Sequence, residues 1–143
     1  MVRYFALLMG IAFVLAGIGG FVPGITQSPH ADMPEMALST SYGLLLGLFP
    51  INLLHNLIHL ALGVWGLAAF RAESSARLYC RALAITLAIF VMMGVLPALS
   101  TTFGLLPLFG HDIWLHGLEA AVAFYLGYVY KTRFTREVHL GNV

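Results

Sequence analysis

The sequence predicts an all-α integral membrane protein that folds as an antiparallel four-helix bundle, and three observations lead to that prediction. Of its 143 residues, 60% are hydrophobic and only 9% are charged, with a mean hydropathy of +0.90, whereas soluble domains carry about 25% charged residues. The apolar residues fall in four runs, each near the roughly 20 residues that a tilted helix needs to cross a bilayer. These runs do not alternate polar with apolar residues as barrel strands do, so helices are expected.

The four expected spans form a single domain of residues 1–143. The first follows Arg3 in the manner of a signal peptide, but it is long and glycine-rich and lacks a small-residue cleavage motif before Pro23, so we expect it to be retained. Its small residues (Ala6, Gly10, Gly17 and Gly24) share one face, which favours close packing against another helix. The spans are Tyr4–Val22, Ile51–Phe70, Leu78–Leu96 and Ile113–Tyr130.

The first long connection is expected to contain a short helix, Met36–Leu48, that lies at the outer surface of the membrane. Asp32, Pro34 and Glu35 precede it in the pattern typical of a helix start. Pro50 then suits the first turn of the second span. The connection before the fourth span is short and apolar, and we expect it to pack against the bundle or the headgroups.

The basic residues predict the orientation of the bundle. None of the seven Lys and Arg residues falls in the connections that follow the first and third spans. By the positive-inside rule, both termini and the second connection therefore lie in the cytoplasm, and an even number of spans agrees with that. The basic residues are Arg3, Arg71, Arg77, Arg81, Lys131, Arg133 and Arg136.

A narrow polar stripe runs along the otherwise apolar second span. Because a helix advances about 100° per residue, Asn52, Asn56 and His59 fall on one face, and His55 lies about 60° from Asn52. Two glycines further along the same face permit close approach of another helix. Polar groups are costly in hydrocarbon, so this stripe is expected to face protein and not lipid.

The fourth span repeats the pattern, because Asp112, His116 and Glu119 share one face and Asp112 is a candidate N-cap. Both spans start from the outer side, which brings His55 and His116 to a similar depth. We therefore expect one shared polar cluster between the second and fourth helices, in the outer half of the bilayer. Its expected members are Asn52, His55, Asn56, His59, Asp112, His116 and Glu119.

Three functions fit such a cluster. In the leading hypothesis it is structural: hydrogen bonds between helices lock a non-catalytic bundle without a cofactor, as in an accessory subunit of a larger membrane complex or in a homo-oligomer. In the second, His55, His59 and His116 bind haem or a divalent transition metal. In the third, Glu119 and the histidines form part of a proton, ion or quinone pathway, as in a component of a coupled transporter.

Other classes of function find no support in the residues. Cys80 is the single cysteine, so the chain has no thiol metal motif. There is no basic patch with interleaved aromatic residues, which argues against a nucleic-acid partner and leaves the lipid bilayer as the expected surrounding. The sequence has no phosphate-binding loop and no nucleophile at helical spacing from a base. We therefore predict that the protein is not an enzyme.

Two motifs resemble a known family. The run Leu46–Leu60 (LGLFPINLLHNLIHL) and the run Gly104–His116 (GLLPLFGHDIWLH) are similar, in this order and spacing, to a family of small bacterial membrane proteins described as domain of unknown function 4383. The similarity extends from Tyr4 to about Tyr128. It implies a four-helix protein of the bacterial plasma (inner) membrane and implies no activity. Glu119 stands where many relatives are expected to carry a small or apolar residue.

Overall fold

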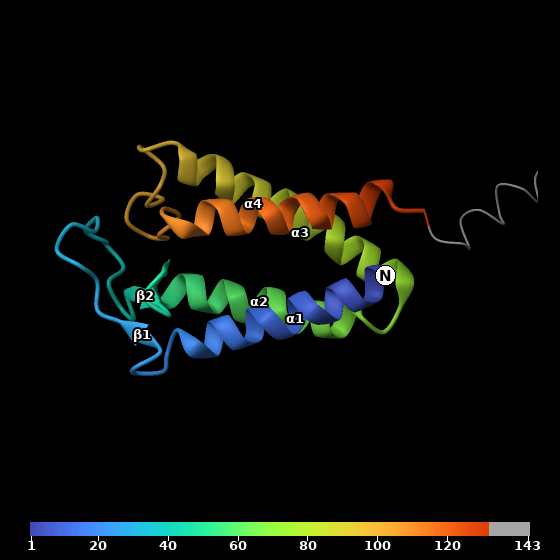
Figure 1. The fold of residues 1–143 in the computed structure, drawn as a ribbon, viewed down its shortest axis with the longest axis horizontal. Coiled ribbons are helices and arrows are strands. Elements are labelled where there is room, and N and C mark those ends of the chain that lie inside the picture. Colours follow the sequence, from blue (N-terminus) through green and yellow to red (C-terminus); the bar gives the residue numbers. More distant parts are fainter. Residues whose placement is uncertain (132–143) are drawn as a thin grey trace, which may run out of the picture.

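A computed structural model describes residues 1–131 as an elongated, mostly helical molecule with a small sheet at one end (Figure 1). The helices predicted from the sequence are present, whereas the sheet was not predicted. In chain order the described elements are α1 (Val2–Gly19), β1 (Thr26–Gln27), β2 (Gly43–Leu45), β3 (Phe49–Ile51), α2 (Leu53–Ala69), α3 (Glu73–Val95), α4 (His111–Phe124) and the π-helix η1 (Tyr125–Val129).

Two of these helices, α1 with 18 residues and α3 with 23, are long and apolar enough to cross a membrane. Helix α2 is equally apolar but has 17 residues. Helix α4 has 14 residues and continues directly into η1. Four helical segments were predicted and four are found in residues 1–131, with ends that differ from the predicted ones by a few residues.

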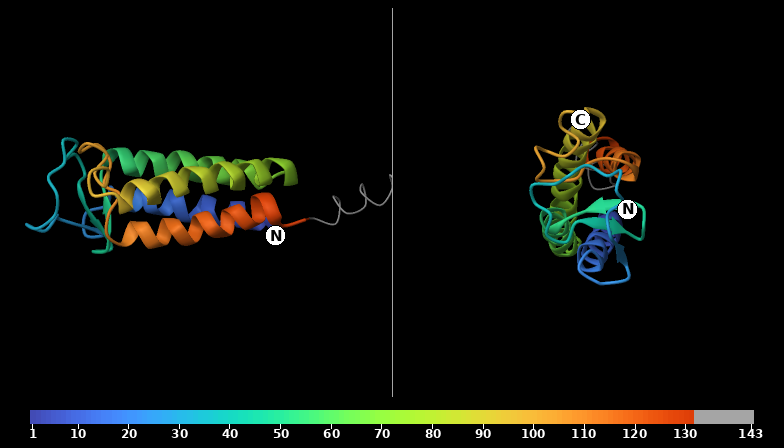
Figure 2. Two further views of the ribbon diagram at one scale, coloured as in Figure 1. Left: turned by 90° about the horizontal axis from the view of Figure 1, so that it is seen from above. Right: turned by 90° about the vertical axis from the view of Figure 1, so that its left-hand side faces the viewer.

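The helices form two antiparallel pairs, α1 with α2 and α3 with α4 (Figures 1 and 2). An apolar core joins the two pairs at the end of the molecule that holds the N-terminus and the α2–α3 connection. There Val2, Ala69 and Tyr79 are 0–2% exposed, and Leu126 of η1 packs into the same cluster.

Glycines bring α1 and α2 unusually close together, as the sequence predicts. A Cβ added at Gly10 would lie 2.7 Å from the backbone nitrogen of Leu67, and one at Gly63 would lie 2.7 Å from that of Val14. Only helices without side chains at these points can approach so closely. Gly24 was predicted to share this face, but α1 ends at Gly19 and Gly24 lies in the following turn with φ +91°.

The predicted surface helix Met36–Leu48 is not formed, and this expectation was wrong. The second half of that segment is a hairpin in which β2 pairs with β3, and β1 pairs antiparallel with β2. Leu46 and Gly47 adopt φ 55° and 72° in the turn, a conformation that a helix cannot contain and that glycine favours. Pro50 accordingly belongs to β3 and not to the first turn of α2.

The loop that precedes the hairpin is tied to it by Tyr42. The Tyr42 hydroxyl donates a hydrogen bond of 2.8 Å to the carbonyl of Pro34. Desolvation by burial raises the pKa of Tyr42, so the hydroxyl keeps the proton that it donates. In the connection before α4, Leu106 and Leu108 are buried, which agrees with the prediction that this apolar segment packs against the bundle.

Arginine side chains bind backbone carbonyls at the end of the molecule opposite the sheet. Arg3 donates to the carbonyl of Phe70 at 2.7 Å, Arg77 to that of Tyr130 at 2.8 Å, and Arg81 to that of Gly127 at 2.9 Å. These bonds supply donors to carbonyls at the C-terminal ends of α2 and η1, where helical partners are missing. We call this the arginine end and the other the sheet end. Arg133 and Arg136 of the predicted cytoplasmic tail lie outside the described residues.

Substitution of Gly10 by Ala is expected to destabilise the fold. All three atoms nearest to the added Cβ belong to the backbone of α2, so the two helices must separate, at a cost of about 1–3 kcal/mol. The midpoint of thermal unfolding in detergent should fall by at least about 2 °C. The matched control is Gly117→Ala, where the added Cβ meets only Val91 at 3.9 Å. Equal midpoints for the two variants would contradict the close-packing account.

Candidate functional site

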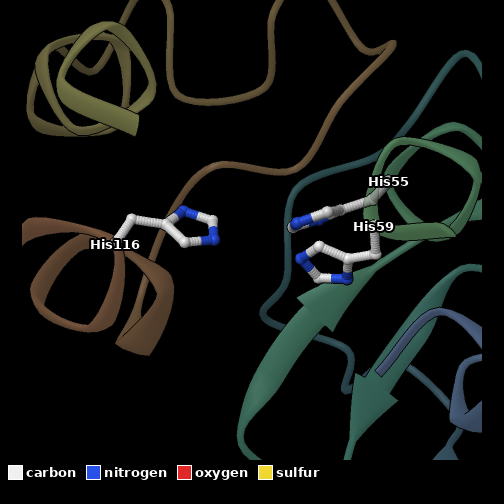
Figure 3. Close-up of side chains that lie close together, drawn as sticks. All are labelled: His55, His59 and His116. Carbon is white, nitrogen blue, oxygen red and sulfur yellow. The ribbon is translucent and has the colours of Figure 1, made fainter. Parts of the chain in front are cut away.

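Three histidines meet between α2 and α4 near the sheet end. His55 and His59 lie one turn apart on α2, and His116 points toward them from α4 (Figure 3). One nitrogen atom from each ring lies within 4.8 Å of the corresponding atoms of the other two. All three side chains are buried, at 0%, 8% and 4% exposure respectively.

The rings are grouped around one point and are not stacked as a column. The ring centroids of His55 and His59 are 4.4 Å apart, and His116 lies 5.9 Å from His55 and 6.3 Å from His59. The interplanar angles between them range from 48° to 75°. Tilted rings direct their nitrogens toward a common space, which is the arrangement that a shared ligand requires.

Three ring nitrogens in this cluster are buried and lack hydrogen-bond partners among the described residues. Both ring nitrogens of His55 and Nδ1 of His59 are buried without one. An unsatisfied buried polar atom costs about 1–3 kcal/mol, so such atoms in a native protein call for an explanation. These three nitrogens therefore make no direct hydrogen bond to another helix among the described residues.

A carboxylate lies beside the histidines. Oδ2 of Asp112 is 3.7 Å from Nδ1 of His55, and both side chains are almost fully buried. Asp112 was predicted to be the N-cap of its helix, but the N-cap is Gly110, and Asp112 lies in the first turn of α4. The carboxyl group there still lies near the positive end of the helix dipole.

Glu119 lies one turn beyond His116 and is less enclosed. It lines the same pocket as His59, Asp112 and His116, and its Oε2 atom is buried without a hydrogen-bond partner. Its position is the one expected from the i, i+3 spacing on α4. The described residues provide no ion pair for this carboxyl group.

Asn52 has a structural role that the sequence did not reveal. It is the N-cap of α2, where its Oδ1 accepts from the backbone N–H of His55 at 3.0 Å. Its Nδ2 donates to the carbonyls of Leu38 at 3.0 Å and Leu105 at 2.8 Å. Asn52 therefore precedes the helix and joins three segments at the sheet end, instead of belonging to the stripe on the helix face.

Asn56 is buried but does not join the histidines. A Cβ added at Gly20 would lie 2.1 Å from its Oδ1, which places the amide against the end of α1. The structure thus brings together His55, His59, His116 and Asp112, with Glu119 on the same pocket, and it separates Asn56 from them.

Two phenylalanines border the histidines, and no pattern in the sequence pointed to them. The ring of Phe13 on α1 stacks on His59, with centroids 5.3 Å apart and an interplanar angle of 22°. Phe90 on α3 lies 6.3 Å from His116. Their contacts depend on how α1 and α3 pack, which helical periodicity within one segment cannot predict. They shield the cluster on two sides with apolar surface.

A comparison with protein families matches residues 3–129 to the family described as a domain of unknown function (DUF4383). The chain belongs to this family, as the two motifs predicted, and the family description names no activity. Neither the curated proteins nor the solved structures provide a match.

Replacement of Asn52 separates its two roles. Asn52→Ala removes the cap and both Nδ2 bonds, whereas Asn52→Asp keeps an oxygen for the N–H of His55 but replaces the donor by an oxygen that faces two carbonyls. Loss of a cap costs about 0.5–2 kcal/mol and each further unsatisfied carbonyl adds to that. The thermal midpoint is expected to fall in both variants, because each loses both Nδ2 bonds and Asn52→Asp also places an acidic oxygen against two buried carbonyls. A midpoint unchanged in Asn52→Ala would show that these bonds contribute nothing.

Proposed function

We propose that this chain is an integral protein of the bacterial plasma membrane that binds one transition-metal ion through His55, His59 and His116. The membrane placement is supported by the composition, by the two helices long enough to cross, and by the many large apolar side chains exposed along the helices. In this placement all four helical segments cross the membrane, because α2 and the continuous α4–η1 segment run alongside α1 and α3 (Figure 2).

The orientation is inferred from the two ends of the molecule. Arg3, Arg77 and Arg81 lie at the arginine end, while the connections at the sheet end contain acidic residues and no Lys or Arg. By the positive-inside rule the arginine end faces the cytoplasm, as do both termini. The histidines then lie in the outer half of the bilayer.

The observation that carries the metal proposal is the convergence of three buried imidazole nitrogens within 4.8 Å. Nitrogens bound to one zinc ion at about 2.0–2.1 Å lie roughly 3.3 Å apart in tetrahedral geometry. Small side-chain rotations that close the cluster by about 1.5 Å would therefore complete the site. Imidazole ligands suit zinc, copper, iron and nickel and do not suit magnesium or calcium.

Asp112 fits the role of a supporting group. Histidines that bind metals usually donate their other N–H to a carboxylate, which fixes the orientation of the ring. Nδ1 of His55 faces Oδ2 of Asp112, which leaves Nε2 for the ion. An ion held by these three ligands would have room for a further ligand, and His59, Asp112 and His116 also line a pocket.

Metal binding accounts for the unpartnered nitrogens better than the two closest alternatives. A purely structural lock would pair the imidazoles with each other or with Asn56, and those bonds are not made among the described residues. A haem held by one histidine from each helix would need the space between them for its ring, which the third imidazole fills. We assign no catalytic residue and no proton path.

Removal of any of the three histidines is expected to abolish metal binding. The full chain, purified without a polyhistidine tag and dialysed against zinc or cobalt, should hold about one ion per chain by elemental analysis. His55→Ala, His59→Ala and His116→Ala should each hold less than a tenth of that. Cobalt should add visible absorption bands typical of a tetrahedral site, and these should be lost in the same variants.

The matched control is His111→Ala, which removes an exposed histidine of the same helix that accepts a hydrogen bond from Trp114. This variant should keep its metal. Wild-type protein that takes up no more zinc or cobalt than the triple His→Ala variant would overturn the metal proposal and return the structural hypothesis to first place.

Labelling of single cysteines tests the orientation. In a Cys80→Ser background, Ser28→Cys places a thiol on an exposed loop of the sheet end, and Ser75→Cys places one near the start of α3 at the arginine end. A membrane-impermeant maleimide added to intact cells, with the outer membrane permeabilised, should label the first variant only. Lysis should make both reactive. Labelling of the second variant alone in intact cells would reverse the proposed orientation.

A further inference from the structure

A pocket of about 560 Å³ lies beside the histidines, between α1 and α4. These two helices belong to different pairs and have little backbone contact with each other. Apolar side chains of α1, among them Ala12 and Leu15, form one wall, and Leu46 and Phe49 of the hairpin close the end. Leu15 and Leu46 are each 64% exposed at the rim, so the pocket opens sideways on the face that lies against lipid in the proposed placement.

The deep side of this pocket is polar. His59, Asp112, His116 and Glu119 line it, and Nδ1 of His59, Oδ2 of Asp112 and Oε2 of Glu119 are buried without partners. A ligand that satisfies these atoms needs hydroxyl or carbonyl groups on a compact head. The long apolar wall that leads to the rim needs a hydrocarbon tail.

The charges of the lining residues select among lipids. Two carboxyl groups and no Lys or Arg line the pocket in the part of the chain that the structure describes. A phosphate or a free carboxylate would find no Lys or Arg partner among these lining residues, and burial of an unpaired charge disfavours phospholipids and fatty acids. The head is therefore uncharged. Phe13 and Phe49 also border the pocket and provide aromatic surface against which a flat ring packs well.

We propose that this pocket binds a lipid-soluble quinone or its quinol, with the ring against His59 and Glu119 and the tail leaving past Leu15. The oxygens of a quinone accept from imidazole N–H groups, and the hydroxyls of a quinol donate to carboxylates, so either form finds partners. The proposal rests on the proposed membrane placement. It shares His59 with the proposed metal site but does not require the metal, because Glu119 and the wall of α1 are not metal ligands.

Photolabelling tests this pocket directly. The full chain is placed in nanodiscs of phosphatidylcholine and exposed to a photoreactive azido-benzoquinone with a short alkyl tail. Mass spectrometry should locate the label on peptides that contain residues 12–19 and 112–119. Decyl-ubiquinone in excess should reduce the labelling at least about tenfold, whereas oleate and phosphatidylglycerol should leave it unchanged.

Two variants and one control test whether the labelled quinone lies in this pocket. Ala12→Trp fills the pocket and should reduce specific labelling about tenfold or more, while Ala61→Trp, at an exposed alanine of α2 outside the pocket, should not change it. Glu119→Leu tests the polar end and should weaken competition by decyl-ubiquinone about tenfold. Thermal midpoints of all three variants show whether each one is folded.

Elemental analysis of the same samples separates this inference from the metal proposal. Wild type that holds its metal but shows no labelling that decyl-ubiquinone displaces would overturn the quinone site alone. Displacement of the photolabel more strongly by oleate or phosphatidylglycerol than by decyl-ubiquinone would do the same. The wild type could instead take up no zinc or cobalt on dialysis and still show labelling at residues 12–19 and 112–119 that decyl-ubiquinone displaces. That result would support the quinone site and overturn only the metal proposal. Labelling that is equal in Ala12→Trp and wild type would also exclude this pocket.

Discussion

The amide side chain of Asn52 holds three separate segments together at the sheet end, and the position of the histidines depends on it. Its oxygen starts α2 by accepting the N–H of His55, and its nitrogen reaches the connections that contain Leu38 and Leu105. The start of α2 fixes the rotation of that helix about its own axis. The rotation in turn decides whether His55 and His59 face α4 or lipid, because a shift of one residue turns a helical side chain by about 100°.

The buried polar groups of the bundle divide into two kinds. Those of Asn52 are satisfied by backbone groups of the same chain, as expected of a residue that stabilises the fold. Those of His55, His59 and Glu119 include atoms without partners among the described residues, as do those of Asn56 and Tyr79, but the first three are gathered around one pocket or its adjoining histidine cluster. Polar atoms in an apolar interior are tolerated when something binds them, so the same interior contains one residue that serves folding and a neighbouring group that is arranged for a ligand.

Helical periodicity predicted what depends on one segment at a time. The four helical segments, the small-residue face of α1 and the shared side of His116 and Glu119 all follow from spacing along a helix. The hairpin did not, because the apolar residues Leu44, Leu45 and Leu48 fit a helix as well as a strand, and the positive φ of Leu46 and Gly47 decides between them. The placement of Phe13 on His59 and of Asn56 on Gly20 depends on contacts between segments. The spacing of residues within one helix does not predict such contacts.

The division of the bundle into two tight pairs has a mechanical consequence. Within each pair the helices are locked, by backbone contact at Gly10 and Gly63 in one and by the arginine bonds to η1 in the other. The two pairs are joined by apolar packing from the arginine end to the middle of the bundle, and by the hydrogen bond from Asn52 to the carbonyl of Leu105 at the sheet end. A small pivot of one pair against the other is therefore restrained at both ends of the bundle, and the histidines lie between the two attachments. Such a pivot would alter the spacing of His116 from its two partners and the width of the lateral opening in a single movement.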